Sequence, residues 1–296
     1  MTLEKPKLSV IVPVSGEPDR IMFLGSWFRP TNVIHLEVII IEDNLTQQTK
    51  KELDRQLLEL CSQYSQIRVV GNFGNPGDAR NAGLTQATGD WIAFWDSDDL
   101  PNLDTVAEVL AETESRESDF IYTDFLIKRG SSENLVKNKF AAENQIVDLS
   151  LVALEPGIWR FTFRRGILQG INFPSLRMGE DQIFMTKLEL HKHKGRYVKR
   201  NSYIYRKAIL GQLTENQNRI KYLESSLSEQ LAILGEYPSR FGKIVAIKQS
   251  VSLIVGGNLS SKLKGIQILL KVTLLHRSWY ELIYVLVKHA RISGNK

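Results

Sequence analysis

Short apolar runs alternate with amphipathic segments over about the first 125 residues of the chain. The runs are rich in Val and Ile, which is typical of buried strands, and they lie at 8–12, 36–41, 67–70, 91–95 and 120–124. The segments between them carry apolar residues at helical spacing, at 47–63, 78–86 and 103–117, with a shorter one at 20–27. Strands that alternate with helices predict βαβ units and an α/β fold with a doubly wound, mostly parallel sheet.

The pattern changes after about residue 130. The polar segment 131–143 is expected to form a loop, 159–171 has mixed periodicity, 181–191 has helical spacing and 197–206 alternates like a strand. Beyond Thr214 the spacing is helical throughout, which predicts a C-terminal helical extension. We therefore expect a sheet domain over 1–214, with halves of about 1–125 and 126–214, followed by a helical region over 215–296.

Polar clusters follow three of the predicted strands directly, at 13–16, 42–44 and 96–99. Because ligands bind at the carboxyl ends of parallel strands, the three clusters should converge on one site. The last cluster places Asp96, Asp98 and Asp99 within four residues, and such carboxylates repel one another unless a cation is present. A hard divalent metal shared with substrate phosphates would supply it. Alone, the cluster could equally be a solvated turn with a helix-capping Asp before Pro101.

A Pro-Gly turn at Pro76 and Gly77 leads into a predicted helix that carries Arg80 in its first turn. A helix N-terminus beside an arginine favours an anion, since backbone N–H groups and the guanidinium both present positive charge. The alternative is a Gly-initiated helix with a surface arginine.

The composition is that of an ordinary globular protein, with 296 residues, 43% hydrophobic and 24% charged, and a net charge of +5. The single cysteine, Cys61, rules out an intramolecular disulfide and fits a reducing compartment; its helical surroundings favour a structural residue. The N-terminus has neither the pattern of a signal peptide nor that of a membrane span, so we expect a cytoplasmic protein.

Five motifs in order resemble those of family-2 glycosyltransferases of the GT-A fold, which is Rossmann-like. They are Val12-Pro13 at the end of the first strand, Asp43 after Val-Ile-Ile-Ile, the segments 77–84 (Gly-Asp-Ala-Arg-Asn-Ala-Gly-Leu) and 94–99 (Phe-Trp-Asp-Ser-Asp-Asp), and 178–184 (Met-Gly-Glu-Asp-Gln-Ile-Phe). The match covers about 210 residues. Each motif is weak alone, and the ordered set carries the resemblance.

The resemblance implies transfer of a sugar from a nucleotide diphosphate donor, usually with Mg²⁺ or Mn²⁺. Asp43 would then accept a hydrogen bond from the base, typically uracil. Pro13 and Val14 would line the base and ribose site through backbone groups, and Arg80 would help to hold the donor.

The same resemblance assigns the acidic cluster. Asp96 and Ser97 would lie near the ribose, Asp98 would be the principal metal ligand with Asp96 beside it, and Asp99 would be a supporting carboxylate. One departure follows the second strand, where Asn44 stands in place of the family's glycine, so we expect a different turn there.

Asp181 is the candidate general base, because the acceptor hydroxyl must lose a proton as it attacks the anomeric carbon. Glu180 would support it or contact the acceptor. The alternative for both is a pair of helix-start carboxylates favoured by the helix dipole. Arg206 belongs to a Tyr-Arg segment that, by resemblance, closes over the donor phosphates, and its alternative is a solvated arginine on an edge strand.

The C-terminal region is basic, with seven Lys or Arg residues and only Glu281 as an acidic residue between 262 and 296. Ile266, Leu269, Leu270 and Thr273 would share one helix face. Such helices can complete the core, lie on an anionic membrane surface or form a homodimer. The segment has no run long and apolar enough to span a bilayer.

The sequence thus predicts an inverting, metal-dependent glycosyltransferase. Its donor would be a nucleotide sugar, a UDP-sugar by resemblance, and its acceptor a glycan or lipid-linked hydroxyl in cell-surface polysaccharide synthesis. A nucleotidyltransferase would need a Gly-rich nucleotide loop with a Lys or Arg signature, which 13–18 lacks. A degenerate, sugar-binding relative is the non-enzymatic alternative. Basic and aromatic residues are not interleaved in the tail, so we expect no nucleic-acid partner.

Overall fold

The computed structural model describes residues 7–28, 34–58, 64–113, 117–129, 132–136, 149–207 and 218–293. The expectation for Cys61 and the domain boundary near Thr214 fall outside these residues.

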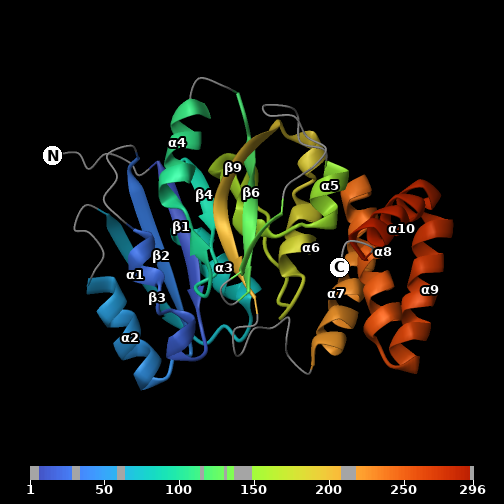
Figure 1. Cartoon of the computed structure of the whole chain (residues 1–296), viewed down its shortest axis with the longest axis horizontal. Coiled ribbons are helices and arrows are strands. Elements are labelled where there is room, and N and C mark those ends of the chain that lie inside the picture. The colour runs from blue at the N-terminus through green and yellow to red at the C-terminus, as the bar shows by residue number, and fades with distance from the viewer. Residues whose placement is uncertain are drawn as a thin grey trace.

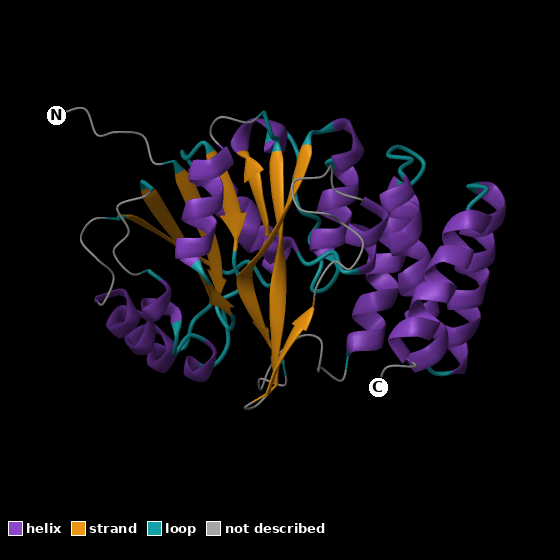
Figure 2. Ribbon diagram, turned by 45° about the horizontal axis from the view of Figure 1, so that its top comes forward, coloured by secondary structure: helices purple, strands orange, loops and turns teal. Residues whose placement is uncertain are grey.

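The described residues form a nine-stranded sheet at the centre of the molecule (Figures 1 and 2), ordered β3-β2-β1-β4-β8-β6-β9-β5 with β7 paired to β6. The strands are β1 (Leu8–Val14), β2 (Leu36–Asp43), β3 (Ser65–Gly71), β4 (Trp91–Phe94), β5 (Leu100–Pro101), β6 (Phe120–Arg129), β7 (Ser132–Val136), β8 (Phe161–Arg164) and β9 (Gly195–Arg206). β1 pairs in parallel with both β2 and β4, so the strand order reverses there. The predicted doubly wound, mostly parallel sheet is confirmed.

The second half of the sheet is mixed, because β8 lies antiparallel between β4 and β6. Two short strands were not predicted. β7 occupies part of the expected loop 131–143 and pairs antiparallel with β6, and β5 pairs with β9. In the first half of the sheet, Pro13 and Val14 extend β1 instead of starting a loop, because they continue its parallel register with β2.

Helices cover both faces of the sheet (Figure 1). In the first two thirds they are α1 (Leu24–Trp27), α2 (Gln47–Leu58), α3 (Pro76–Gln86), α4 (Leu103–Thr113), α5 (Leu149–Leu154) and α6 (Glu180–Lys187). Val10 of β1 belongs to the same buried cluster as Leu53 of α2. Its neighbour Ile11 belongs to the other cluster, together with Ala79 of α3. Alternate residues of β1 therefore enter opposite cores, which explains why the strand is apolar apart from Ser9.

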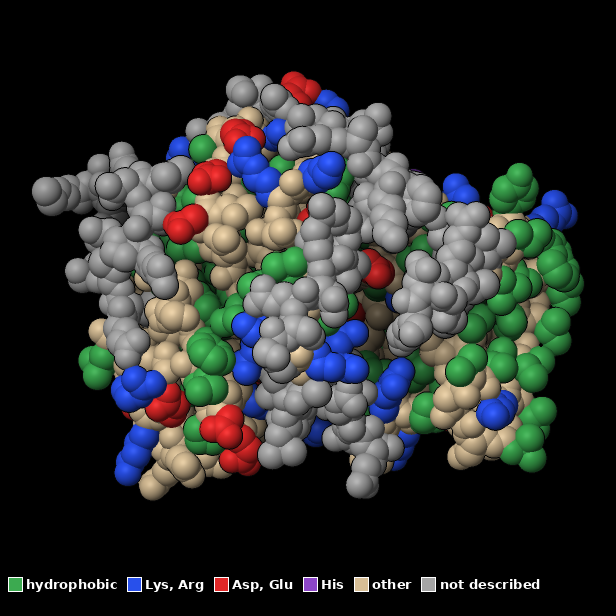
Figure 3. Space-filling view, viewed as in Figure 1, with side chains coloured by type: hydrophobic (Ala, Val, Ile, Leu, Met, Phe, Trp, Pro, Cys, Tyr) green, Lys and Arg blue, Asp and Glu red, His purple; other side chains and the backbone are tan. Residues whose placement is uncertain are grey.

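Four helices follow at one end of the sheet (Figure 1), namely α7 (Arg219–Ile233), α8 (Arg240–Gly256), α9 (Leu259–Leu275) and α10 (Trp279–Ser293). The side chains of Ser239 and Asn258 cap α8 and α9 by accepting hydrogen bonds from Gly242 N and Ser261 N. Among the described helices none combines the length and the apolar character needed to cross a membrane. Hydrophobic side chains nevertheless gather on the outer surface of this end (Figure 3).

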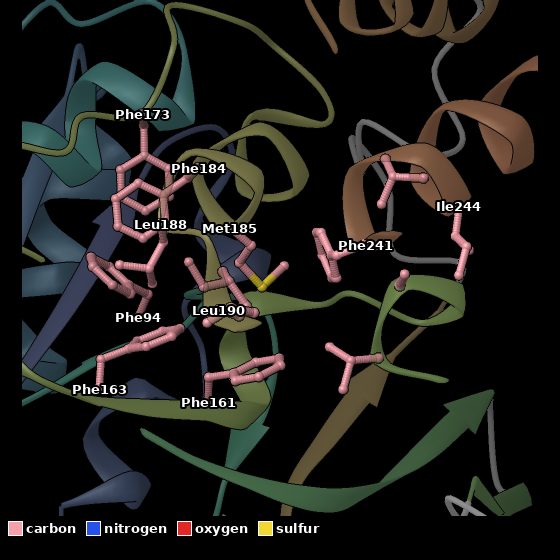
Figure 4. Packing of buried hydrophobic residues seen from close by; sticks show 14 of the residues in the cluster. Phe94, Phe161, Phe163, Phe173, Phe184, Met185, Leu188, Leu190, Phe241 and Ile244 are labelled. Carbon is pink, nitrogen blue, oxygen red and sulfur yellow. The ribbon is translucent and has the colours of Figure 1, made fainter. Parts of the chain in front are cut away.

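One hydrophobic core joins the sheet to the C-terminal helices (Figure 4). The rings of Phe173 and Phe184 stack at 3.9 Å between centroids, and Phe94 of β4 meets Phe173 edge-on at 5.1 Å. The same cluster continues to Phe241 and Ile244 of α8, which are fully or almost fully buried. α8 thus completes the core beneath α6, the helix that begins at Glu180.

Candidate active site

A cavity of about 610 Å³ opens where the chain leaves β1, β2 and β4. The beginnings of α3 and α6 form its other walls. It brings together eight of the residues that the sequence singled out: Pro13, Asp43, Arg80, Asp96, Ser97, Asp98, Glu180 and Asp181. The expected convergence of the three strand-end clusters is therefore confirmed.

Asp43 ends β2 and fixes the loop that follows β3. Its Oδ1 accepts hydrogen bonds from the backbone N–H groups of Phe73 at 2.7 Å and Gly74 at 3.1 Å. Asn44 next to it has a φ of 50°, in the left-handed region, where Asn is tolerated far better than most residues. The turn therefore forms without the family's glycine, and Asp43 lies on the cavity wall.

Arg80 connects α3 to both acidic walls. Asn75 caps α3, because its side chain accepts a hydrogen bond from Asp78 N, and this start places Arg80 one turn into the helix. The buried guanidinium donates to Glu180 Oε1 at 2.5 Å and to Asp96 Oδ1 at 2.7 Å. Burial alone would lower the pKa of Arg80, but the neighbouring carboxylates raise it, so the side chain stays charged.

Asp181 follows Glu180 in the first turn of α6, which starts after Gly179 at a φ of 79°. Burial and the adjacent Glu180 carboxylate raise the pKa of Asp181 to about 7, although Arg80 opposes the shift. A carboxylate of this kind exchanges a proton near neutral pH, which is the property that a general base needs.

Asp98 lies in the turn that follows β4 and also lines the cavity. Its Oδ2 accepts a hydrogen bond from Arg20 at 3.0 Å, and the Asp98 side chain is only 8% exposed. Burial and the nearby Asp96 raise the pKa of Asp98. Arg20 lowers it, but the net effect is an increase. Asp99 is completely buried, and burial together with Asp98 and Asp96 raises its pKa well above the usual range.

The carboxylates of Asp96 and Asp98 fit a divalent cation by their chemistry. Both line the cavity, both offer the hard oxygen ligands that Mg²⁺ and Mn²⁺ prefer, and Asp96 helps to raise the pKa of Asp98, a like-charge effect that a cation relieves. Within the described ranges, however, no group of three or more His, Cys, Asp or Glu side chains forms a ready-made metal site.

Two of the predicted binding residues are absent from the cavity lining. The side chain of Val14 is fully buried in the core, which leaves only its backbone near the site. Arg206 lies behind Asp98: its Nη1 donates to the Asp98 carbonyl at 3.0 Å and its backbone N–H to Asp99 Oδ1 at 2.7 Å. In this conformation Arg206 supports the acidic turn of 96–99.

Sequence reasoning missed several lining residues, among them Arg20, Trp159, Arg177 and Tyr205. Trp159 stacks on Tyr205, with ring centroids 5.6 Å apart, and forms an aromatic wall. The alternation of Tyr203 and Tyr205 on β9 is a signal for a shared aromatic face. No local signal identifies Arg20, because its partner Asp98 is distant in the sequence.

Known glycosyltransferases are similar to this chain in sequence. The chain is 29% identical over 209 residues to TarS of Staphylococcus aureus (strain MW2), a poly(ribitol-phosphate) beta-N-acetylglucosaminyltransferase; the match covers 67% of this chain and 35% of TarS. It is 24% identical over 216 residues to the putative glycosyltransferase EpsH of Bacillus subtilis, covering 69% of this chain and 62% of EpsH. The chain thus spans about a third of the length of the TarS proteins it matches.

Solved structures share the fold. The crystal structure of residues 1–349 of S. aureus TarS with UDP-GlcNAc superimposes with a TM-score of 0.68 at 20% identity, over 97% of this chain and 92% of that one. A mannosyltransferase from Pyrobaculum calidifontis, in complex with GDP-Man and Mn²⁺, gives a TM-score of 0.52 at 17% identity, over 96% and 87% of the two chains. The family model described as Glycosyl transferase family 2 matches residues 9–185, and this protein is therefore a member of that family.

Proposed function

We propose that this chain transfers a sugar from a UDP-sugar to a hydroxyl of a glycan or lipid-linked acceptor, with inversion at the anomeric carbon. The observation that carries the proposal is the single cavity shared by Asp43, Asp98 and Asp181. Asp43 and Asp98 come from strand ends on the side where nucleotides bind in such sheets, and Asp181 comes from the opposite wall. The TarS structure with UDP-GlcNAc supports the choice of uridine.

In this proposal the donor lies along the strand ends. Asp43 and the backbone of Pro13 and Val14 take the base, Asp96 and Ser97 adjoin the ribose, and Arg80 faces the phosphates. Arg80 reaches Asp96 and Glu180 together, so it would also hold the donor and acceptor walls in register.

Asp181 would act as the base. It takes the proton of the acceptor hydroxyl while that oxygen bonds to the anomeric carbon, and the bond from this carbon to the nucleotide diphosphate breaks. The attack comes from the face opposite the leaving group, which inverts the centre. Burial and the neighbouring Glu180 carboxylate keep the pKa of Asp181 high, so the carboxylate is a stronger base than an ordinary aspartate.

Asp98 and Asp96 would hold a Mg²⁺ or Mn²⁺ ion. When bound, such a metal neutralises the charge that develops on the departing diphosphate. Arg20 would share Asp98 with the ion, because the hydrogen bond from Arg20 goes to one of the two carboxylate oxygens, Oδ2.

The acceptor would bind at a different part of the cavity from the donor. Trp159, Tyr205 and Arg177 line the cavity and give it an aromatic and basic wall. Such a wall suits a sugar or alditol ring with nearby phosphate, because aromatic faces stack on apolar ring surfaces and arginine pairs with phosphate. The relatives that act on poly(ribitol-phosphate) support a cell-surface polymer as acceptor.

Nucleotide binding tests the proposal directly. UDP with Mn²⁺, at 100 times its Kd, should stabilise the protein by about 2.7 kcal/mol in thermal unfolding. GDP should do so less, and Asp98→Ala should lose most of the metal-dependent part. Asp104→Ala removes an exposed carboxylate of α4 outside the cavity lining and serves as the matched control. Equal stabilisation of wild type and Asp98→Ala, or none by UDP, would contradict the proposal.

A further inference from the structure

The outer surface of α9 and α10 exposes an apolar stripe. Apart from Met22, Leu58 and Val70, every large hydrophobic side chain recorded as exposed in the described part of the chain lies between Val255 and Leu286. We call the stripe the α9–α10 face, and it consists of Leu259, Leu263, Ile266, Leu270, Leu274, Trp279, Ile283 and Leu286. Figure 3 shows hydrophobic side chains concentrated at this end of the molecule.

The stripe is separate from the core. On α9 its residues recur at intervals of three and four, which puts them on one side of the helix. Gly265, Ile268 and Val272 lie on the opposite side and are buried toward α8, where a Cβ at Gly265 would lie 3.0 Å from the Ser250 carbonyl. α9 is therefore already anchored by its inner side, and more than half of Leu263 and Leu270 stays exposed, at 59% and 52%.

Basic side chains border the stripe. Lys262 projects on one side of it and Lys271 on the other, by their helical positions, whereas Lys264 lies 3.7 Å from Glu224 of α7. α9 contains no acidic residue. The nearest acid on α10, Glu281, lies within 3.6 Å of Arg240 and its side chain is 13% exposed, so it does little to offset the positive charge.

Aromatic residues mark one end of the stripe. Trp279 and Tyr280, at the start of α10, are 54% and 81% exposed. Trp and Tyr are enriched at the boundary between lipid headgroups and hydrocarbon, because each combines an apolar ring with a polar group. A monomeric protein rarely leaves so continuous an apolar surface uncovered.

We propose that the α9–α10 face binds the surface of an anionic lipid bilayer. Its apolar stripe would enter the headgroup boundary while Lys262 and Lys271 contact anionic headgroups. A second copy of the chain suits the face less well, because an isologous pairing would bring Lys262 and Lys271 of both copies together and α9 has no acidic residue to pair with them. This binding would keep the enzyme beside lipid-linked or membrane-attached acceptors, and it is independent of the chemistry in the cavity.

Vesicle co-sedimentation of the full chain tests the proposal. Wild type should bind vesicles of phosphatidylglycerol and phosphatidylcholine and stay in solution with phosphatidylcholine alone. The triple variant Leu263→Ser, Ile266→Ser, Leu270→Ser should bind at least about tenfold more weakly. Lys262→Gln and Lys271→Gln should each weaken binding about fivefold at low salt.

Two variants on α2 serve as controls, since Leu58 is 86% exposed and Lys51 is exposed, both outside the face. Leu58→Ser and Lys51→Gln should bind as wild type does, and circular dichroism should show all variants folded. Failure of wild type to bind anionic vesicles would overturn the proposal. So would a wild-type dimer that the triple variant dissociates, because the face would then be an interface between copies.

Discussion

At the scale of single residues, Asp181 combines a position in the cavity with an unusual proton affinity. Its carboxylate has a pKa raised to about 7 by burial and by Glu180, so it is the group best suited to accept a proton near neutral pH. Asp181→Asn keeps the size and removes the base. We expect kcat to fall by about 10²- to 10⁴-fold with UDP binding nearly unchanged. Steady-state kinetics together with calorimetric titration of UDP will measure both.

The pH profile provides the control. The proposed reaction needs Asp181 deprotonated, so the wild-type rate should fall as pH decreases through about 7, by about tenfold for each further unit. Asp181→Asn should lack this dependence. A wild-type kcat/KM that is flat between pH 5 and pH 8 would remove Asp181 from the role.

The positions of the acidic residues follow from sequence more readily than their properties do. Asp43 and Asp98 were found because each follows a strand whose end lies at a known edge of the sheet. The ion pair between Arg20 and Asp98 was not predicted, because no local sequence pattern specifies a contact between residues so far apart in the chain. The shifted pKa of Asp181 also depends on tertiary burial, which the helix-start motif alone does not reveal.

At the scale of elements, the start of α6 depends on Gly179. This glycine has a φ of 79°, and a Cβ there would collide with the side chain of Ser226 on α7. Gly179→Ala should destabilise the protein by about 2–4 kcal/mol, the sum of backbone strain and overpacking. It should also lower activity, because Glu180 and Asp181 follow directly. Denaturant unfolding and kinetics will measure the two effects.

Gly170 is a matched control because its φ is 76° and a Cβ there would meet nothing within 4 Å. Gly170→Ala should therefore cost only the backbone strain, about 1 kcal/mol. If the two alanine variants lost equal stability, close packing between α6 and α7 would not be the reason for Gly179.

Long periodic elements were predictable and short ones were not. The apolar runs of β1 and β2 are buried on both faces, so their composition alone identifies them. β5 has only two residues, and it forms because Leu100 and Pro101 lie beside β9. β7 has a largely polar sequence, and it forms a strand because it pairs with β6. Such strands are determined by their partners.

At the scale of the whole molecule, the C-terminal helices have two different relations to the sheet domain. α8 is buried along most of its length and shares the core that underlies α6. α9 and α10 are buried on one side and apolar on the other. The sequence left packing and surface binding open as alternatives for this region, because apolar positions on a helix do not say which neighbour covers them.

Gln249 of α8 links these helices to the active site. Its Nε2 donates to Gln182 Oε1 at 2.9 Å, next to Asp181, and to Ser226 Oγ of α7 at 3.0 Å. Gln249→Leu keeps the volume and removes both hydrogen bonds, so α6 loses a constraint beside Asp181, the proposed base. We expect kcat to fall by about 10- to 100-fold, as small misplacements of reacting groups do, with the fold retained. Ser250→Ala is the control on the same helix, because among the described residues its hydroxyl donates within α8, to the Ala246 carbonyl. If Gln249→Leu and Ser250→Ala both kept wild-type kcat, the C-terminal helices would support the stability of the enzyme without positioning its base.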